Sequence, residues 1–111
     1  MDITSKIIED CQILTVNDTR IDAAVALQFK NEIRTIAEAD SKRLILNLEN
    51  VAFLDSSGLG AVVATFKLFN GRCSFELAGL TETVAKVFRL TRMDMVFTIH
   101  EDAFDALKVT Q

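Results

Sequence analysis

The chain has 111 residues, half of them apolar and a quarter charged, which is typical of one folded domain rather than a disordered segment. Its net charge of −4 argues against nucleic-acid binding, because such binding requires a basic surface. No apolar run approaches the roughly 18 residues needed to cross a bilayer, and the polar N-terminal stretch does not resemble a secretory signal. We therefore expect one cytoplasmic domain over residues 1–111 with no membrane partner.

The first part of the chain predicts a hairpin followed by a helix and a strand. Residues 3–8 and 11–17 have the composition of short strands, and the link between them is so short that the two must be antiparallel. Asp22 is expected to open a helix, whose apolar residues 25, 29, 33, 36 and 37 would form one stripe. Residues 43–48 are expected to form a third, buried strand.

The second part continues this alternation of helices and strands. We expect a helix over residues 57–69, a strand near 72–77, and a helix that Thr81 caps. A short strand over 96–99 and a helix over 101–107 complete the chain. The order predicts an α/β fold with a mixed, mostly parallel sheet, an N-terminal antiparallel hairpin and about four helices.

The string Asp55-Ser56-Ser57-Gly58-Leu59-Gly60 stands between a strand and a helix. Asp and Ser side chains accept hydrogen bonds from the free N–H groups of a helix's first turn, and Ser57 is the expected cap. Asp55 would position the turn, while Gly58 and Gly60 would permit a tight helix start. Two hypotheses remain open: the string only caps the helix, or a serine in it is a phosphorylation switch, since a helix N-terminus tolerates a phosphate.

Residues for catalysis or metal binding are scarce. His100 is the one histidine, so the three or four convergent ligands of a metal site are missing, and His100 is expected to be an ordinary surface or helix-cap residue. The residues around Ser56 do not fit the G-x-S-x-G pattern of serine hydrolases, and no phosphate-binding glycine loop is present. We expect no enzymatic activity, no cofactor and no metal.

The two cysteines, Cys11 and Cys73, both lie in strand-like segments. Buried free thiols are the expected state, with a disulfide or a reactive thiol as alternatives. Reduced cysteines agree with a cytoplasmic protein.

Residues 44–51 (LILNLENV) followed by 53–60 (FLDSSGLG) closely resemble the bacterial anti-sigma factor antagonists, which are single STAS domains. The D-S-S-G-L-G string after a strand of the type L-N-L-E is a specific match. Residues 72–77 and 81–90 resemble the strand and helix that follow in the family. The resemblance implies a STAS-like fold over nearly the whole chain.

The resemblance also implies a function. In the family, a serine-specific kinase that is also the anti-sigma factor phosphorylates the serine directly after the aspartate, which by position is Ser56. The unphosphorylated form binds the kinase and frees its client, and a serine phosphatase resets the system. The partner-binding residues implied for this chain are Asp22, Asp55, Ser56, Ser57, Gly58, Leu59 and Gly60. Residues 16–21 depart from the family pattern, in which many members carry a glycine turn before the acid that Asp22 resembles.

Three other functions were weighed. A two-component receiver domain with Asp55 as phosphoacceptor would need an acidic pair after a first strand that leads into a helix, and the predicted hairpin does not fit. A STAS scaffold or a module that binds a small ligand or an anion remains an alternative, although no residue cluster marks a pocket. A partner switch that releases an effector other than a sigma factor is the third.

The C-terminal part is rich in large apolar residues. Met93, Met95 and Phe97 are expected to close the core, together with Phe104 and Leu107. The alternative is an adaptable contact patch, because thioethers repack easily.

Overall fold

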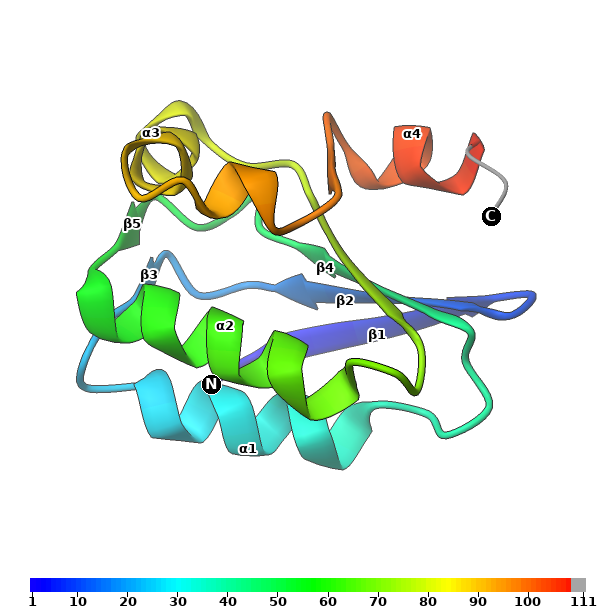
Figure 1. Ribbon diagram of the computed structural model, residues 1–111. Helices are drawn as coiled ribbons and strands as arrows, with labels where there is room; N and C mark the ends of the chain where they lie inside the picture. The colour runs from blue at the N-terminus through cyan, green and yellow to red at the C-terminus, as the bar shows by residue number, and fades with distance from the viewer. Residues whose placement is uncertain (109–111) are drawn as a thin grey trace.

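Strands and helices alternate along the computed structural model, which describes residues 1–108 (Figure 1). The strands are β1 (Ile3–Ile8), β2 (Cys11–Val16), β3 (Arg20–Ile21), β4 (Arg43–Asn47), β5 (Phe53–Leu54), β6 (Ser74–Ala78) and β7 (Ile99–His100). The helices are α1 (Ala26–Ile36), α2 (Ser56–Phe69), α3 (Glu82–Leu90) and α4 (Ala103–Lys108), with a 3₁₀ turn, η1 (Met93–Met95). The predicted α/β class is confirmed. Residues 109–111 of the expected domain lie outside the described residues.

The main sheet has the strand order β1-β2-β4-β6-β7. β1 and β2 form the predicted antiparallel hairpin, and the other neighbouring pairs are parallel. A second, very small sheet joins β3 to β5 in parallel. Sequence analysis missed β3 and β5, because two residues are too few to show the alternation of a strand.

The two faces of the main sheet are covered differently. Residues that alternate along β2, β4 and β6 point to opposite faces, so Leu14, Leu46 and Leu77 join the main apolar cluster with α1, α2 and α3. Ile13 and Ile45 belong to a smaller cluster that α4 covers through Ala106. Figure 1 shows α1 and α2 side by side on one side of the strands and α4 on the other.

Helix α1 begins later than expected. The predicted start was Asp22, but residues 23–25 form a turn and the helix begins at Ala26. The Asp22 carboxylate accepts a hydrogen bond from the Ala24 N–H at 3.1 Å, which is a local turn that competes with a helix. Phe29 and Ile33 of the predicted stripe are fully buried, and Ile36 and Ala37 pack against the main cluster. Val25 lies in the turn before the helix.

The segment after α3 also differs from the expectation. Arg92 adopts a left-handed backbone with φ 61°, and η1 follows it, so the last strand begins only at Ile99. Phe97 is buried at 5% exposure and Met93 packs against the main cluster, as expected. Met95 is 82% exposed and Phe104 is 75% exposed, so the expectation that they close the core was wrong.

Both cysteines are free, as expected. Cys11 is buried in β2, and Cys73 is half-buried just before β6. Burial raises the pKa of both thiols, which keeps them protonated and weakly nucleophilic at neutral pH.

A buried ionic network lies on the face of the sheet that α4 covers. The Arg43 guanidinium donates to both oxygens of Glu76, at 2.9 Å from Nε and 2.6 Å from the terminal nitrogen. The same nitrogen donates to the Ala106 carbonyl of α4 at 2.9 Å. His100 Nε2 lies 2.7 Å from Glu76 Oε1, and the side chain of His100 is only 8% exposed. His100 is therefore a buried partner in this network, and the expected surface or cap role was wrong.

Burial by itself raises the pKa of Glu76, but hydrogen bonds from Arg43 and His100 outweigh it and hold that pKa below its usual value. The charged carboxylate is thus the form that the fold stabilises. The network links β4, β6 and β7 and anchors α4 to them.

We expect Glu76→Gln to lower the free energy of unfolding by about 3–5 kcal/mol, because the change leaves the Arg43 charge buried without its anion. Glu82→Gln is the matched control. Glu82 also pairs with an arginine, Arg89, at 2.8 Å, but its side chain is 85% exposed. Its loss should be about 0.5 kcal/mol or less. Urea denaturation followed by circular dichroism measures both variants, and equal losses would contradict the prediction.

The contribution of Glu76 should depend on pH. Because its pKa is lowered in the folded state, the stabilisation is present in full above the unfolded value, about 4.3. It is lost as the pH falls below that value and through the lowered pKa of the folded state. The difference in free energy of unfolding between wild type and Glu76→Gln should therefore shrink as the pH falls from about 5 towards about 3. A difference that stays constant or grows over that acidic range would contradict the assignment.

Candidate functional site

The start of α2 is capped by Asp55. This residue has extended backbone, and one carboxylate oxygen accepts the Gly58 N–H at 2.8 Å. The Asp55 carbonyl accepts the Leu59 N–H at 2.9 Å. The helix begins at Ser56, so Asp55 is the N-cap and the expectation that Ser57 is the cap was wrong. An aspartate favours this position both as an acceptor and through its charge at the positive end of the helix dipole.

Gly58 is required by a close approach of two backbones. A Cβ at this position would lie 1.9 Å from the carbonyl oxygen of Ile21 and 2.8 Å from its carbon. Ile21 belongs to β3 and is paired with Leu54 of β5. The first turn of α2 therefore rests directly on the β3 backbone. Gly60 is different, because a Cβ there would meet nothing within 4 Å, so the expectation that it permits the tight start was wrong.

The second carboxylate oxygen of Asp55 reaches across to the turn before α1. It accepts the Ala23 N–H at 3.2 Å. Asp22, the neighbouring residue, pairs with Arg20 at 3.2 Å. Asp55 thus joins the start of α2 to the turn that carries Asp22, and these two acids lie at the same end of the molecule.

Arg20 and Phe53 form an exposed pair on the small sheet. The Arg20 guanidinium carbon lies 4.3 Å from the centre of the Phe53 ring. Phe53 is 37% exposed, and the two residues are neighbours in the register of β3 and β5. Sequence analysis missed this pair, because only the pairing of two-residue strands brings residues 20 and 53 together.

The structure brings most of the sequence-predicted residues together. Asp55, Ser56, Ser57 and Gly58 form the start of α2, and Asp22 lies beside them through Asp55. Ser56 and Ser57 are both exposed, and neither serves as the cap. Leu59 is half-buried against the main cluster, and Gly60 is exposed on the next turn of the helix.

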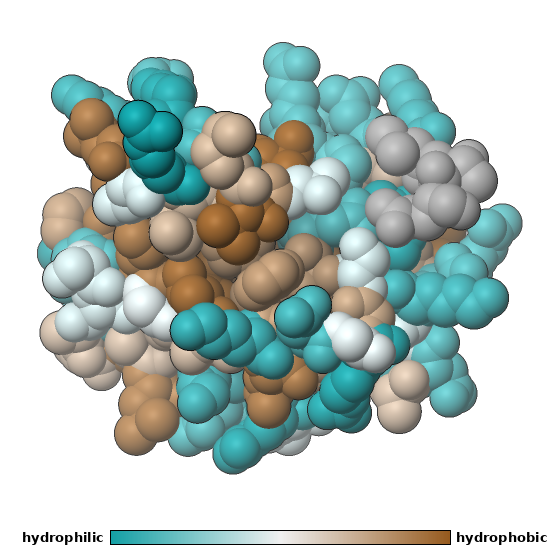
Figure 2. Space-filling model, viewed as in Figure 1, coloured by the Kyte–Doolittle hydropathy of each residue, from teal (hydrophilic) through white to brown (hydrophobic). Residues whose placement is uncertain are grey.

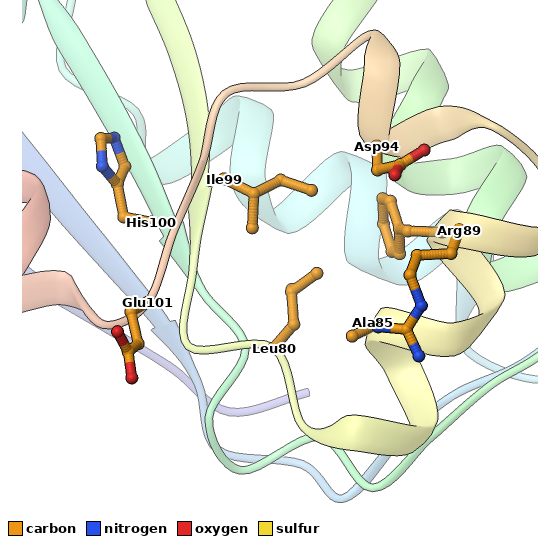
Figure 3. Close-up of a pocket in the computed structure, with 8 residues that line it drawn as sticks. Leu80, Ala85, Arg89, Asp94, Ile99, His100 and Glu101 are labelled. Carbon is orange, nitrogen blue, oxygen red and sulfur yellow. The ribbon is translucent and has the colours of Figure 1, made fainter.

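A separate pocket of about 310 Å³ lies between α3, η1 and the end of β7. Figure 3 shows Leu80 and Ile99 pointing into it, whereas His100 points away from it. Arg89, on the rim, is already paired with Glu82. The volume is at the lower end of the range of small-ligand sites. The pocket is lined by Leu80, Ala85, Phe88, Arg89, Asp94, Ile99, His100 and Glu101.

Within residues 1–108 no group of three or more His, Cys, Asp and Glu side chains is placed to hold a metal ion. None of the helices in this range is long and apolar enough to cross a membrane.

The two glycines of α2 should respond oppositely to the same substitution. Gly58→Ala is expected to lower the free energy of unfolding by at least about 2 kcal/mol, because the new methyl group overlaps the Ile21 carbonyl. Gly60→Ala is expected to raise it by about 0.5–1 kcal/mol, because alanine favours the helix and the site is open. Urea denaturation of both variants tests this. A neutral Gly58→Ala would show that α2 does not rest on β3 as described.

Comparison with known proteins identifies the family. The STAS domain family model matches residues 2–106. An anti-sigma-B factor antagonist of Staphylococcus aureus is 31% identical over 72 residues, which cover 63% of this chain and 67% of the relative.

Solved structures have the same fold. A candidate anti-sigma factor antagonist of Thermotoga maritima superposes with a TM-score of 0.84 at 26% identity, covering 96% of this chain and 92% of its own. The Bacillus protein SpoIIAA in its phosphorylated form has a TM-score of 0.67 at 20% identity, covering 96% of this chain and 97% of its own. The chain therefore belongs to the STAS domain family, as its D-S-S-G-L-G string had indicated.

Proposed function

We propose that this chain is an anti-sigma factor antagonist that acts by partner switching. Its unphosphorylated form binds a serine kinase that is also the anti-sigma factor, and so frees the client of that kinase. Phosphorylation of Ser56 switches the binding off, and a serine phosphatase restores it. The observation that carries the proposal is an exposed serine directly after the capping aspartate of α2.

The geometry allows Ser56 to accept a phosphate without loss of the helix. The cap is made by Asp55, so the Ser56 hydroxyl is not needed for it. The first N–H groups of a helix have no partner within the helix, and the helix dipole favours an anion there. A phosphate adds about −1.5 to −2 charges, so the main change is in the surface that a partner meets.

The base of the site is rigid, and this favours a change of surface over a change of fold. Gly58 fixes the first turn of α2 on β3, and Asp55 ties it to the turn at Ala23. The acids Asp22 and Asp55 already lie here, so a phosphate concentrates negative charge on one small area. A loss of only about 2.7 kcal/mol in binding lowers affinity roughly a hundredfold.

The relatives support this proposal. The Staphylococcus aureus relative is named an anti-sigma-B factor antagonist, and SpoIIAA has been solved in an unphosphorylated and a phosphorylated form. In the proposal this chain is a cytoplasmic substrate of the kinase and not itself an enzyme. Asp22, Ser57, Leu59 and Gly60 form the partner surface around Asp55, Ser56 and Gly58.

A second candidate function is a small-ligand module, and the pocket in Figure 3 is the observation that favours it. Its apolar floor of Leu80, Phe88 and Ile99 suits a small apolar molecule. No residue from the start of α2 lines this pocket, so a ligand held in it would not rest on Ser56.

Substitution of Ser56 tests the switch. The kinase-type partner is recovered from the native cell with the Ser56→Ala variant, purified, and its affinity is measured by calorimetry. Ser56→Ala should bind within about twofold of wild type, and Ser56→Asp should lose about tenfold or more.

Ser57→Ala is the matched control, because Ser57 is equally exposed and one residue away. With the purified kinase and ATP, mass spectrometry should find one phosphate on wild type and on Ser57→Ala, and none on Ser56→Ala. Equal binding by wild type, Ser56→Ala and Ser56→Asp would show that Ser56 is only part of the helix start. It would favour a scaffold or ligand-binding role for the domain.

A further inference from the structure

A band of apolar side chains continues from α2 onto η1. On α2 it consists of Leu59, Val63 and Phe66, which are half-buried against the main cluster. At η1 and the residue after it, the band consists of Met93, Met95 and Val96. Met95 is 82% exposed and Val96 is 47% exposed. Figure 2 shows apolar surface gathered between α2 and the η1 segment. We refer to these six residues as the α2–η1 band.

The band shares a face of α2 with Ser56. The buried positions of this helix are Gly58, Ala61, Val62, Thr65 and Phe69. Residues four and seven positions after Ser56, namely Gly60 and Val63, lie on the same side of the helix as the serine. At about 1.5 Å per residue, Val63 is roughly 10 Å and Phe66 roughly 15 Å from Ser56 along the axis.

The exposed part of the band is held firmly by the core. Phe97 is buried, with its ring centre 5.0 Å from that of Phe66 and 5.7 Å from that of Phe88. Backbone hydrogen bonds close the turn, from Met95 to Arg92 at 3.2 Å and from Val96 to Met93 at 3.0 Å. The backbone that presents Met95 and Val96 to solvent is therefore fixed, and a partner would have to order only their side chains.

The size of a stable interface makes the band relevant to the switch. A standard protein–protein interface covers about 800 Å² on each partner, which corresponds to a disc of roughly 16 Å radius. The start of α2 alone is much smaller than this disc. A partner that covers Ser56 must extend beyond the start of α2, and the α2–η1 band offers apolar surface that continues along this helix.

We propose that the partner that contacts Ser56 also buries Met95 and Val96 in an apolar surface of its own. The partner would then lie along the outward face of α2, with Ser56 at one end of the contact and η1 at the other. The absence of a side chain at Gly60 lets the partner's backbone or side chains come close to α2. Met93 and Met95 can adapt to the partner's shape. The charge on Ser56 controls whether this apolar contact forms. The inference rests on the proposed function, because it uses the same partner.

The test uses the full chain and the kinase-type partner purified for the Ser56 experiment. Met95→Glu and Val96→Glu should each weaken binding about tenfold or more, because each places a charge in the apolar contact. Met95→Leu keeps the apolar character and should bind within about threefold of wild type. Phe104→Glu is the matched control: Phe104 is 75% exposed, but it lies on α4, over the other face of the sheet. It should change affinity about twofold or less. Thermal unfolding confirms that all four variants fold.

The outcomes separate the two proposals. Unchanged binding by Met95→Glu and Val96→Glu, while Ser56→Asp still loses affinity, overturns the extended contact and leaves the switch intact. A loss in the band variants with no effect of Ser56→Asp shows that the band binds the partner without control by Ser56, which overturns the switch and the control that the inference assigns to it. An equal loss in Phe104→Glu shows that the effect is not specific to the band and overturns the inference. If no kinase-type protein is recovered with Ser56→Ala, both proposals fail.

Discussion

The approach of the Gly58 backbone to the carbonyl of Ile21 is the contact on which the geometry of the candidate site depends. It places the first turn of α2 against β3, at a distance that leaves no room for a side chain. The pairing of β3 with β5 holds Ile21 beside Leu54, the residue that precedes Asp55. Ser56 is exposed at the end of a helix whose position is determined by main-chain packing, and a change of its charge need not alter that packing.

Asp55 extends this constraint to the turn before α1. One of its oxygens caps α2 at Gly58, and the other accepts the Ala23 N–H. The same carboxylate therefore starts the helix and positions the segment that carries Asp22. This division explains how a string that reads as a simple helix cap also organises a surface made of two distant parts of the chain.

The opposite face of the sheet has a different role. The buried Arg43–Glu76–His100 network ties three neighbouring strands together and holds α4 through the Ala106 carbonyl. Replacing a buried ion pair by apolar residues often costs little, whereas breaking it is costly, so such a network favours one particular arrangement of its elements. The main apolar cluster lies on the face that α1, α2 and α3 cover, and the ionic network adds directional contacts beneath α4 on the other face.

The local pattern of the sequence was enough to predict the class of the fold and the centre of the candidate site. Apolar periodicity placed the main strands and helices, and the D-S-S-G-L-G string indicated the family and the turn at Ser56, because these features depend on neighbouring residues. The string could not show that Asp55 rather than Ser57 caps the helix, or that Gly58 packs against a backbone while Gly60 lies open. The role of Gly58 depends on Ile21, more than thirty residues away in the chain. The contact between Arg20 and Phe53, the burial of His100 and the exposure of Met95 were likewise decided by the tertiary structure. Each results from packing between segments that are distant in sequence, and local propensity carries no information about such packing.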